Sequence, residues 1–170
     1  MNLDNISGLI DWLDEHDKEL AEKLREDSEL SWCWKETSAW LKIADVPEEL
    51  YEKFVQALIE TKDADYLYLH QRYCGHRDDV LQALIETKKA YYLYYHQLDC
   101  GHRDDVLQAL IETKNADYLY RHQCYCGHRD DVLQALIETK DASCLYRHQL
   151  RCGHRDDVQK VLDELKITAT

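Results

Sequence analysis

Residues 78–88 of this chain read DDVLQALIETK, and the same eleven residues recur at 104–114 and 130–140. A second motif, Cys-Gly-His-Arg-Asp-Asp, begins at four cysteines: Cys74, Cys100, Cys126 and Cys152. Both motifs therefore repeat every 26 residues. A constant period of this length is typical of tandem arrays, in which one supersecondary unit stacks on the next and builds a long surface. Such an array favours binding over catalysis.

Each unit is expected to hold two short helices, called helix A and helix B below. Helix A is typified by residues 78–88, where apolar residues recur at steps of three and four from Val80 to Ile85. Helix B is expected from about Ala64 to Cys74. A glycine follows each B helix, where a left-handed residue is needed: Gly75, Gly101, Gly127 and Gly153. The residues expected to cap B helices are Asp63, Asn115 and Asp141, with Lys89 as the exception.

An apolar period of three to four argues against β-strands, which alternate with a period of two. We therefore predict an all-α, right-handed α-solenoid of two-helix repeats with an N-terminal helical cap. We expect residues 1–46 to form the acidic, Trp-rich cap, residues 47–166 the repeats and residues 167–170 a tail. In the last A helix, Gln159 and Asp163 replace Leu81 and Ile85, which predicts a polar C-terminal capping helix.

Composition excludes several classes of protein. The chain has 170 residues, of which 45% are apolar, so it suits one folded domain rather than a disordered tail. No stretch is apolar enough to span a bilayer, and because the N-terminus lacks a basic stretch followed by an apolar one, we expect no secretory signal. Four of the seven cysteines recur at one fixed position, as expected of a small buried residue copied with the repeat. We expect a reduced, cytoplasmic protein without membrane association.

Charge is distributed unevenly along the chain. The net charge is −13, and residues 1–54 carry 15 acidic and 6 basic residues, or −9. The remainder carries 19 acidic and 15 basic residues, or −4. The acidic N-terminal part should repel nucleic acid and attract basic partners.

Helix B differs between copies, whereas the three A-helix copies at 78–88, 104–114 and 130–140 are identical even at their exposed positions. The varying positions fall on an arc of roughly 100° of the helix surface. We expect them to form a partner-binding face, because Tyr and Arg are enriched at binding hot spots; neutral drift is the alternative. The expected binding residues are Asp65, Leu69, Arg72, Tyr73, Tyr91, Tyr95, Leu98, Asp99, Asp117, Arg121, Tyr125, Arg147, Leu150 and Arg151, and Cys124 and Ser143 vary with them.

His70, Cys74 and His76 have the residue types of zinc ligands, and the pattern recurs in every repeat. Each copy offers three ligands at a spacing that no standard finger uses. The favoured interpretation is structural, with His70 and Gln71 hydrogen-bonded between repeats and Cys74 packed as a small apolar residue. No metal or other cofactor is therefore expected.

An enzyme is not expected. Four identical copies of Arg77, Asp78 and Asp79 are not how active sites are usually built. Two acids suit a helix N-terminus, and Arg77 should pair with an acid of a neighbouring unit. Cys124 and Cys126 have the wrong spacing for a redox pair. A rival hypothesis is stacking of single-stranded RNA on Tyr73, Tyr95 and Tyr125, but the acidic chain opposes phosphate binding.

The segment from Ala57, ALIETKDADYLY, resembles short tandem helical repeats of uncharacterised bacterial and phage proteins, as does its copy from Ala83. The resemblance covers roughly residues 47–166 and brings no assigned activity. A phage setting would imply a small acidic inhibitor of a host defence protein or nucleic-acid-binding protein. Such an inhibitor would mimic nucleic acid with its N-terminal acids: Asp11, Asp14, Glu15, Asp17, Glu19 and their neighbours.

Overall fold

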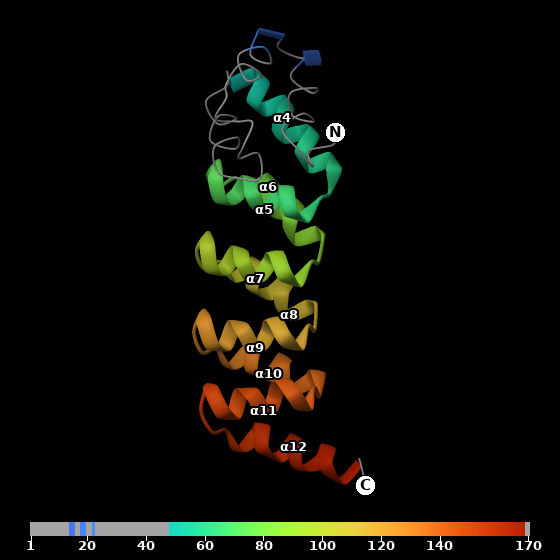
Figure 1. The fold of residues 1–170 in the computed structure, drawn as a ribbon, viewed down its shortest axis with the longest axis vertical. Coiled ribbons are helices and arrows are strands. Elements are labelled where there is room, and N and C mark those ends of the chain that lie inside the picture. Colours follow the sequence, from blue (N-terminus) through green and yellow to red (C-terminus); the bar gives the residue numbers. More distant parts are fainter. Residues whose placement is uncertain (1–13, 16–17, 20–21, 23–47, 169–170) are drawn as a thin grey trace. The chain divides into compact units, whose positions relative to one another are not determined.

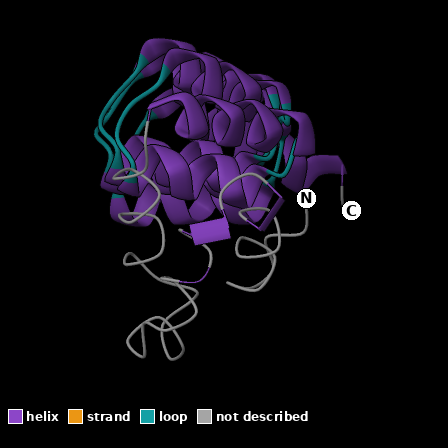
Figure 2. Cartoon of the chain, turned by 90° about the horizontal axis from the view of Figure 1, so that it is seen from above, coloured by secondary structure: helices purple, strands orange, loops and turns teal. Residues whose placement is uncertain are grey.

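The computed structural model describes residues 14–15, 18–19, 22 and 48–168. Almost all of the predicted N-terminal cap, residues 1–46, lies outside these residues. The chain divides into two compact units, Met1–Thr87 and Lys88–Thr170. Throughout the described part, helices and the short loops between them account for the backbone, and none of it is strand (Figure 2). The predicted all-α class is therefore confirmed.

The helices alternate between A and B types within each unit (Figure 1). The first unit contains α4 (Glu48–Thr61), α5 (Ala64–Tyr73) and α6 (Asp78–Glu86). The second contains α7 (Ala90–Asp99), α8 (Asp104–Glu112), α9 (Ala116–Tyr125), α10 (Asp130–Thr139), α11 (Ala142–Arg151) and α12 (Asp156–Thr168). Within each unit, consecutive helices pack on one another, and the 26-residue period of the sequence becomes a period of helix pairs.

Leucines of both helix types form the core. Leu93 and Leu119 on the B helices and Leu110 and Leu136 on the A helices are completely buried. Val106 and Val132 start the buried stripe of their A helices. Burial of each leucine side chain stabilises the folded state by about 1.5–3 kcal/mol. The helical spacing of these residues thus explains both the helices and the way they pair.

The helix boundaries follow local chemistry. The Asp63 carboxylate accepts a hydrogen bond from the backbone N–H of Asp65 at 2.9 Å, and the Asp141 carboxylate accepts from the N–H of Cys144 at 2.8 Å. Asn115 accepts from the N–H of Tyr118, whereas Lys89 makes no side-chain cap. The four predictions about these caps are therefore confirmed.

Two different turns join the helices. After each B helix the glycine has a positive φ, 97° at Gly75 and 115° at Gly127, as predicted. After each A helix a lysine takes the left-handed conformation, with φ of 51° at Lys88 and Lys114. The prediction that helix A extends to Lys88 is wrong, because this left-handed residue ends the helix and α6 stops at Glu86.

The B-to-A turn is closed by a glutamine side chain. Gln97 donates to the carbonyl of Arg103 at 2.6 Å and accepts from the N–H of the same residue at 3.1 Å. Gln71, Gln123 and Gln149 make the same pair of bonds to the arginine six residues later. The fixed glutamine therefore holds the loop that leads into the next repeat.

Candidate protein-binding face of the B helices

The B helices of the second unit, α7, α9 and α11, lie side by side (Figure 1). Aromatic rings join the first two, since Tyr91 and Tyr94 of α7 stand 5.9 Å and 5.7 Å from the ring of Tyr118 on α9. Between α9 and α11, the Arg147 guanidinium lies 4.8 Å from the ring centre of Tyr120. Side chains from three repeats consequently form one continuous surface.

The varying positions of these helices define the variable face. It comprises Tyr91, Tyr95, Leu98, Asp99, Asp117, Arg121, Cys124, Tyr125, Ser143, Arg147, Leu150 and Arg151. None of these twelve residues is buried: seven are exposed, and the half-buried ones are Tyr95, Asp117, Arg121, Cys124 and Arg147. The fixed leucine and histidine of each of these helices, such as Leu119 and His122, are fully buried. The varying side chains thus reach the surface, whereas these two fixed residues face the core.

Large apolar side chains gather on this side. Within the described ranges, the exposed large apolar residues all lie on B helices: Tyr91, Leu98, Tyr125, Tyr146 and Leu150. Leu150 is 67% exposed and Tyr125 59%. Four of the five occupy varying positions, and Tyr146 lies beside them on α11. Exposed apolar groups that cluster on one face are typical of interaction surfaces.

A small charge network crosses the variable face. The Asp117 carboxylate accepts from Arg121 at 2.7 Å on its own helix and from Arg147 on α11 at 3.3 Å. Hydrogen bonding to Asp117 raises the pKa of Arg121 further, so its charge is permanent at any ordinary pH. One carboxylate therefore fixes two guanidinium groups on adjacent repeats, and the face carries cationic groups in ordered positions.

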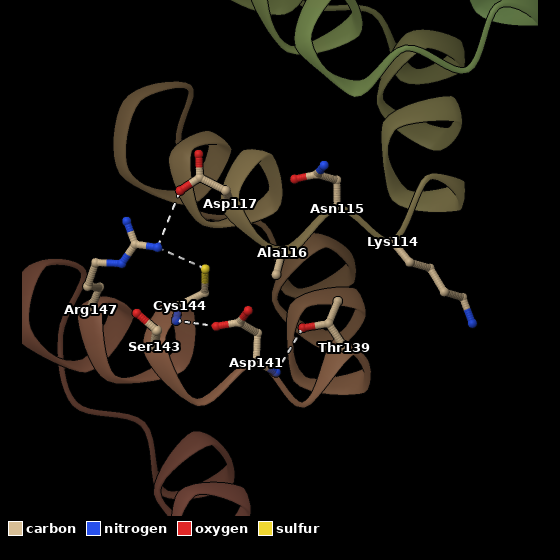
Figure 3. Close-up of a pocket in the computed structure, with 9 residues that line it drawn as sticks. All are labelled: Lys114, Asn115, Ala116, Asp117, Thr139, Asp141, Ser143, Cys144 and Arg147. Carbon is tan, nitrogen blue, oxygen red and sulfur yellow. Dashed lines mark hydrogen bonds and ion pairs between the residues drawn. The ribbon is translucent and has the colours of Figure 1, made fainter.

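Beside this network lies an open pocket of about 490 Å³ between the N-terminal ends of α9 and α11 (Figure 3). Arg147 reaches across it and donates to the Cys144 sulfur at 3.0 Å as well as to Asp117. The lining residues are Lys114, Asn115, Ala116, Asp117, Thr139, Asp141, Ser143, Cys144 and Arg147. Three of them, Asp117, Ser143 and Arg147, belong to the variable face, so the pocket continues that face.

The first unit carries its own B-helix residues on α5. Asp65 and Arg72 are exposed, while Leu69 and Tyr73 are half-buried. Arg72 donates to the Tyr68 hydroxyl at 3.0 Å and lies 5.2 Å from the ring centre of Tyr73. The predicted binding residues of this repeat are therefore also accessible.

The zinc-type residues have separate environments. His70 is fully buried and hydrogen-bonds through Nε2 to the hydroxyl of Tyr51 on α4 at 2.7 Å. His76 is exposed and contacts Asp78 at 3.1 Å. Among the described residues, His, Cys, Asp and Glu side chains do not gather in groups of three or more that could hold a metal ion. Burial lowers the pKa of His70 to about 4, which keeps the ring neutral.

The fixed cysteines are half-buried at the C-terminal caps of the B helices, rather than fully buried as expected. Cap positions lie at the edge of the core, where the following glycine turn leaves one side open. Burial nevertheless raises the pKa of Cys74 to about 12, so this side chain is a neutral thiol at pH 7. A neutral, half-buried thiol at the helix end is compatible with the expectation that Cys74 packs as a small apolar residue.

Three of the fixed arginines also pair with an acid of the preceding A helix. Arg77 pairs with Glu52, Arg129 with Asp104 at 2.7 Å and Arg155 with Asp130 at 3.2 Å. The prediction that Arg77 pairs with an acid of a neighbouring repeat is confirmed. These contacts lie at the N-terminal ends of A helices and involve residues that do not vary between the internal copies.

Some features of this face were missed by sequence reasoning. Tyr146 occupies a fixed position, yet it is 58% exposed, whereas Tyr94 and Tyr120 are buried under the next B helix. The contact between Cys124 and Cys152 joins residues 28 apart and has no motif of its own. The order of the repeats is a signal for both features: Tyr146 lies on the last B helix, and the two cysteines belong to consecutive B helices.

The acids of the predicted nucleic-acid mimic fall largely outside the described residues. Of those named, Asp14, Glu15 and Glu19 are described, the first half-exposed and the other two exposed. Asp11 and Asp17 lie outside. The site built from described residues is therefore the variable face.

In the part of the chain that the structure describes, each helix is too short or too polar to cross a bilayer. Comparisons with protein-family models, with curated proteins and with solved structures each found no match.

Proposed function

We propose that this chain is a protein–protein interaction module that binds its partner through the variable face of the B helices. The helix pairs would belong to a right-handed α-solenoid with an N-terminal helical cap. The observation that carries the proposal is the placement of exposed large apolar side chains, which in the described part all lie on B helices. Four of these five side chains differ between copies, so the variation falls largely on groups that gain most from being covered.

The composition of the face suits a protein partner. Tyr125 and Leu150 supply apolar area, and Arg121 and Arg147 supply directional donors. Tyr and Arg are the residues that most often dominate binding energy at protein interfaces. A partner with an apolar centre and polar groups around it would match this arrangement.

The face is also held in place before binding. Arg121 and Arg147 both pair with Asp117, and the ring centres of Tyr91 and Tyr95 are 4.6 Å apart. Ordering side chains on binding costs roughly 0.5–1.5 kcal/mol each, so groups that are already ordered lose less. Three rigid helices that carry ordered groups can therefore bind without a large entropic cost.

Affinity capture with matched variants tests the proposal. The B-face variant combines Tyr125→Ala, Arg121→Ala and Leu150→Ala, and the control variant combines Gln108→Ala, Glu112→Ala and Gln134→Ala on the exposed side of the A helices. Both sets consist of exposed or half-exposed residues, so melting curves should stay close to wild type. Quantitative mass spectrometry then compares the proteins that each form retains.

The expected result is a protein retained by wild type and by the control variant and lost, at least tenfold, from the B-face variant. Equal retention by all three forms would contradict the proposal. Selective loss from the A-helix control would transfer the binding site to the other side of the repeat.

A further inference from the structure

Two thiols meet at the junction between α9 and α11. The sulfur atoms of Cys124, in the last turn of α9, and Cys152, at the C-terminal cap of α11, are 2.7 Å apart. Both side chains are partly buried, and both belong to the second compact unit. The two residues lie on neighbouring B helices that pack against each other.

This pair arises at a single junction of the array. Cys152 is the fixed cysteine of its repeat, but Cys124 occupies a varying position, filled by Arg72, Leu98 and Leu150 in the other copies. The equivalent neighbour of Cys126 is therefore Leu98, which offers no thiol. A varying position has gained the one side chain that can form a covalent bond to the next repeat.

We propose that Cys124 and Cys152 are a modification site that forms a reversible disulfide between two consecutive B helices. The sulfur atoms would need to approach by only about 0.7 Å to reach the length of a disulfide bond. The bond would crosslink α9 to α11 beside the variable face.

Formation of this disulfide requires a two-electron oxidant, and a disulfide such as oxidised glutathione can serve. One cysteine thiolate attacks a glutathione sulfur, which forms a mixed disulfide and releases one glutathione thiolate. The second cysteine loses its proton and attacks the protein sulfur of the mixed disulfide, and the second glutathione leaves. The two cysteines together lose two protons and two electrons, and the oxidant is reduced to two glutathione molecules.

The surroundings set the rate of this reaction. Burial raises the pKa of Cys152 to about 12, and the hydrogen bond with Cys124 acts in the same direction. Arg151 opposes the shift and Tyr120 lies beside the pair. Because the thiolate is the attacking species, oxidation should be slow at pH 7 and accelerate as pH rises.

The test uses the full-length protein, incubated with oxidised glutathione at pH 8.5 or with dithiothreitol. Intact-mass spectrometry should show a loss of 2 Da only after oxidation. Trypsin without reduction should then link the peptide of residues 122–129 to the peptide of residues 152–155. The Cys124→Ser variant should give neither signal.

Cys126→Ser is the matched control, because it removes the half-buried thiol two residues from Cys124 and shares its tryptic peptide. It should still lose 2 Da and form the same crosslink. The oxidised wild type should melt about 5 °C or more above its reduced form, since the bond closes a loop of intermediate length.

Three results would overturn the proposal. Wild type could stay reduced or carry glutathione alone, or the crosslink could map to other cysteines. Cys124→Ser could also form the crosslinked peptide as readily as wild type. Circular dichroism of each variant establishes that it is folded, so that a missing crosslink reports on chemistry.

Discussion

Arg129, which precedes α10, holds Asp104 of the preceding A helix at 2.7 Å and Asp131 of its own helix at 2.8 Å. Its guanidinium also contacts His102 at 3.2 Å. Arg155 repeats the arrangement with Asp130 and Asp157. The fixed His-Arg-Asp-Asp motif is thereby explained as a chain of contacts from one A helix to the next. Since these groups are largely exposed, they align repeats more than they stabilise them.

Replacing the turn glutamine should destabilise the protein more than replacing an exposed one. Gln97→Ala removes both hydrogen bonds to the backbone of Arg103 and leaves partly buried polar groups without partners. We expect a loss of about 1–3 kcal/mol in the free energy of unfolding. Gln108→Ala, at an exposed position of α8, should change it by less than about 0.5 kcal/mol. Urea unfolding followed by circular dichroism measures both; equal losses would contradict the role of Gln97.

Core and surface leucines should respond differently to truncation. Leu110 is fully buried, so Leu110→Ala should cost about 2–5 kcal/mol. Leu150 is 67% exposed, so Leu150→Ala should cost less than about 0.5 kcal/mol. Denaturant titrations of the two variants provide the comparison. A large loss at Leu150 would mean that this side chain is packed in solution.

The two kinds of turn predict substitutions of opposite sign. Lys114 has a left-handed backbone with φ of 51°, so Lys114→Gly should relieve strain and stabilise the chain by about 0.5–1 kcal/mol. Gly127 has φ of 115°, where an added Cβ meets no atom within 4 Å. Gly127→Ala should nevertheless destabilise by about 1–2 kcal/mol, through the backbone alone. Thermal melts that shift in the same direction for both would refute this explanation.

Buried histidines predict a loss of stability in mild acid. Burial lowers the pKa of His70 and of His122 to about 4, and it lowers that of His148 as well. His102 and Arg129 lower the pKa of His122 further, against an opposing contribution from Asp131. Between pH 6.5 and 4, the unfolded chain therefore binds protons that the folded chain does not.

The free energy of unfolding should thus be constant above pH 6.5 and fall as pH drops toward 4, by roughly 3 kcal/mol for each fully excluded histidine. Urea titrations at pH 8, 6, 5 and 4.5 measure this slope. His122→Leu should make it shallower. If the free energy of unfolding of wild type does not change between pH 7 and 5, the prediction that the folded protein holds its buried histidines neutral is wrong.

The paired helices were predictable because their signals are local. Val80 and Leu84 share one helix face, and Asp63 and Gly75 mark the two ends of a B helix. The left-handed lysines were not predictable, because lysine, unlike glycine, does not favour a backbone with positive φ such as that of Lys114. Its conformation follows from the short turn between two helices.

The candidate site was only partly predictable for a related reason. The varying positions could be found by comparing copies, and the structure leaves them accessible. Tyr94 and Tyr146 occupy equivalent sequence positions, but one is buried by a neighbouring helix and the other is exposed. The contact between Cys124 and Cys152 likewise depends on how two repeats pack. Such properties belong to the stack rather than to any one repeat.

Site-specific photo-crosslinking shows which side of the helix pairs contacts the partner. A photoreactive residue would replace Tyr125 or Leu150 on the B helices, and Gln108 or Gln134 on the A helices, all four being exposed. We expect crosslinks to the captured partner from the two B-helix positions and at most background from the two A-helix positions. Crosslinks of equal yield from both sides, or from the A helices alone, would contradict this expectation.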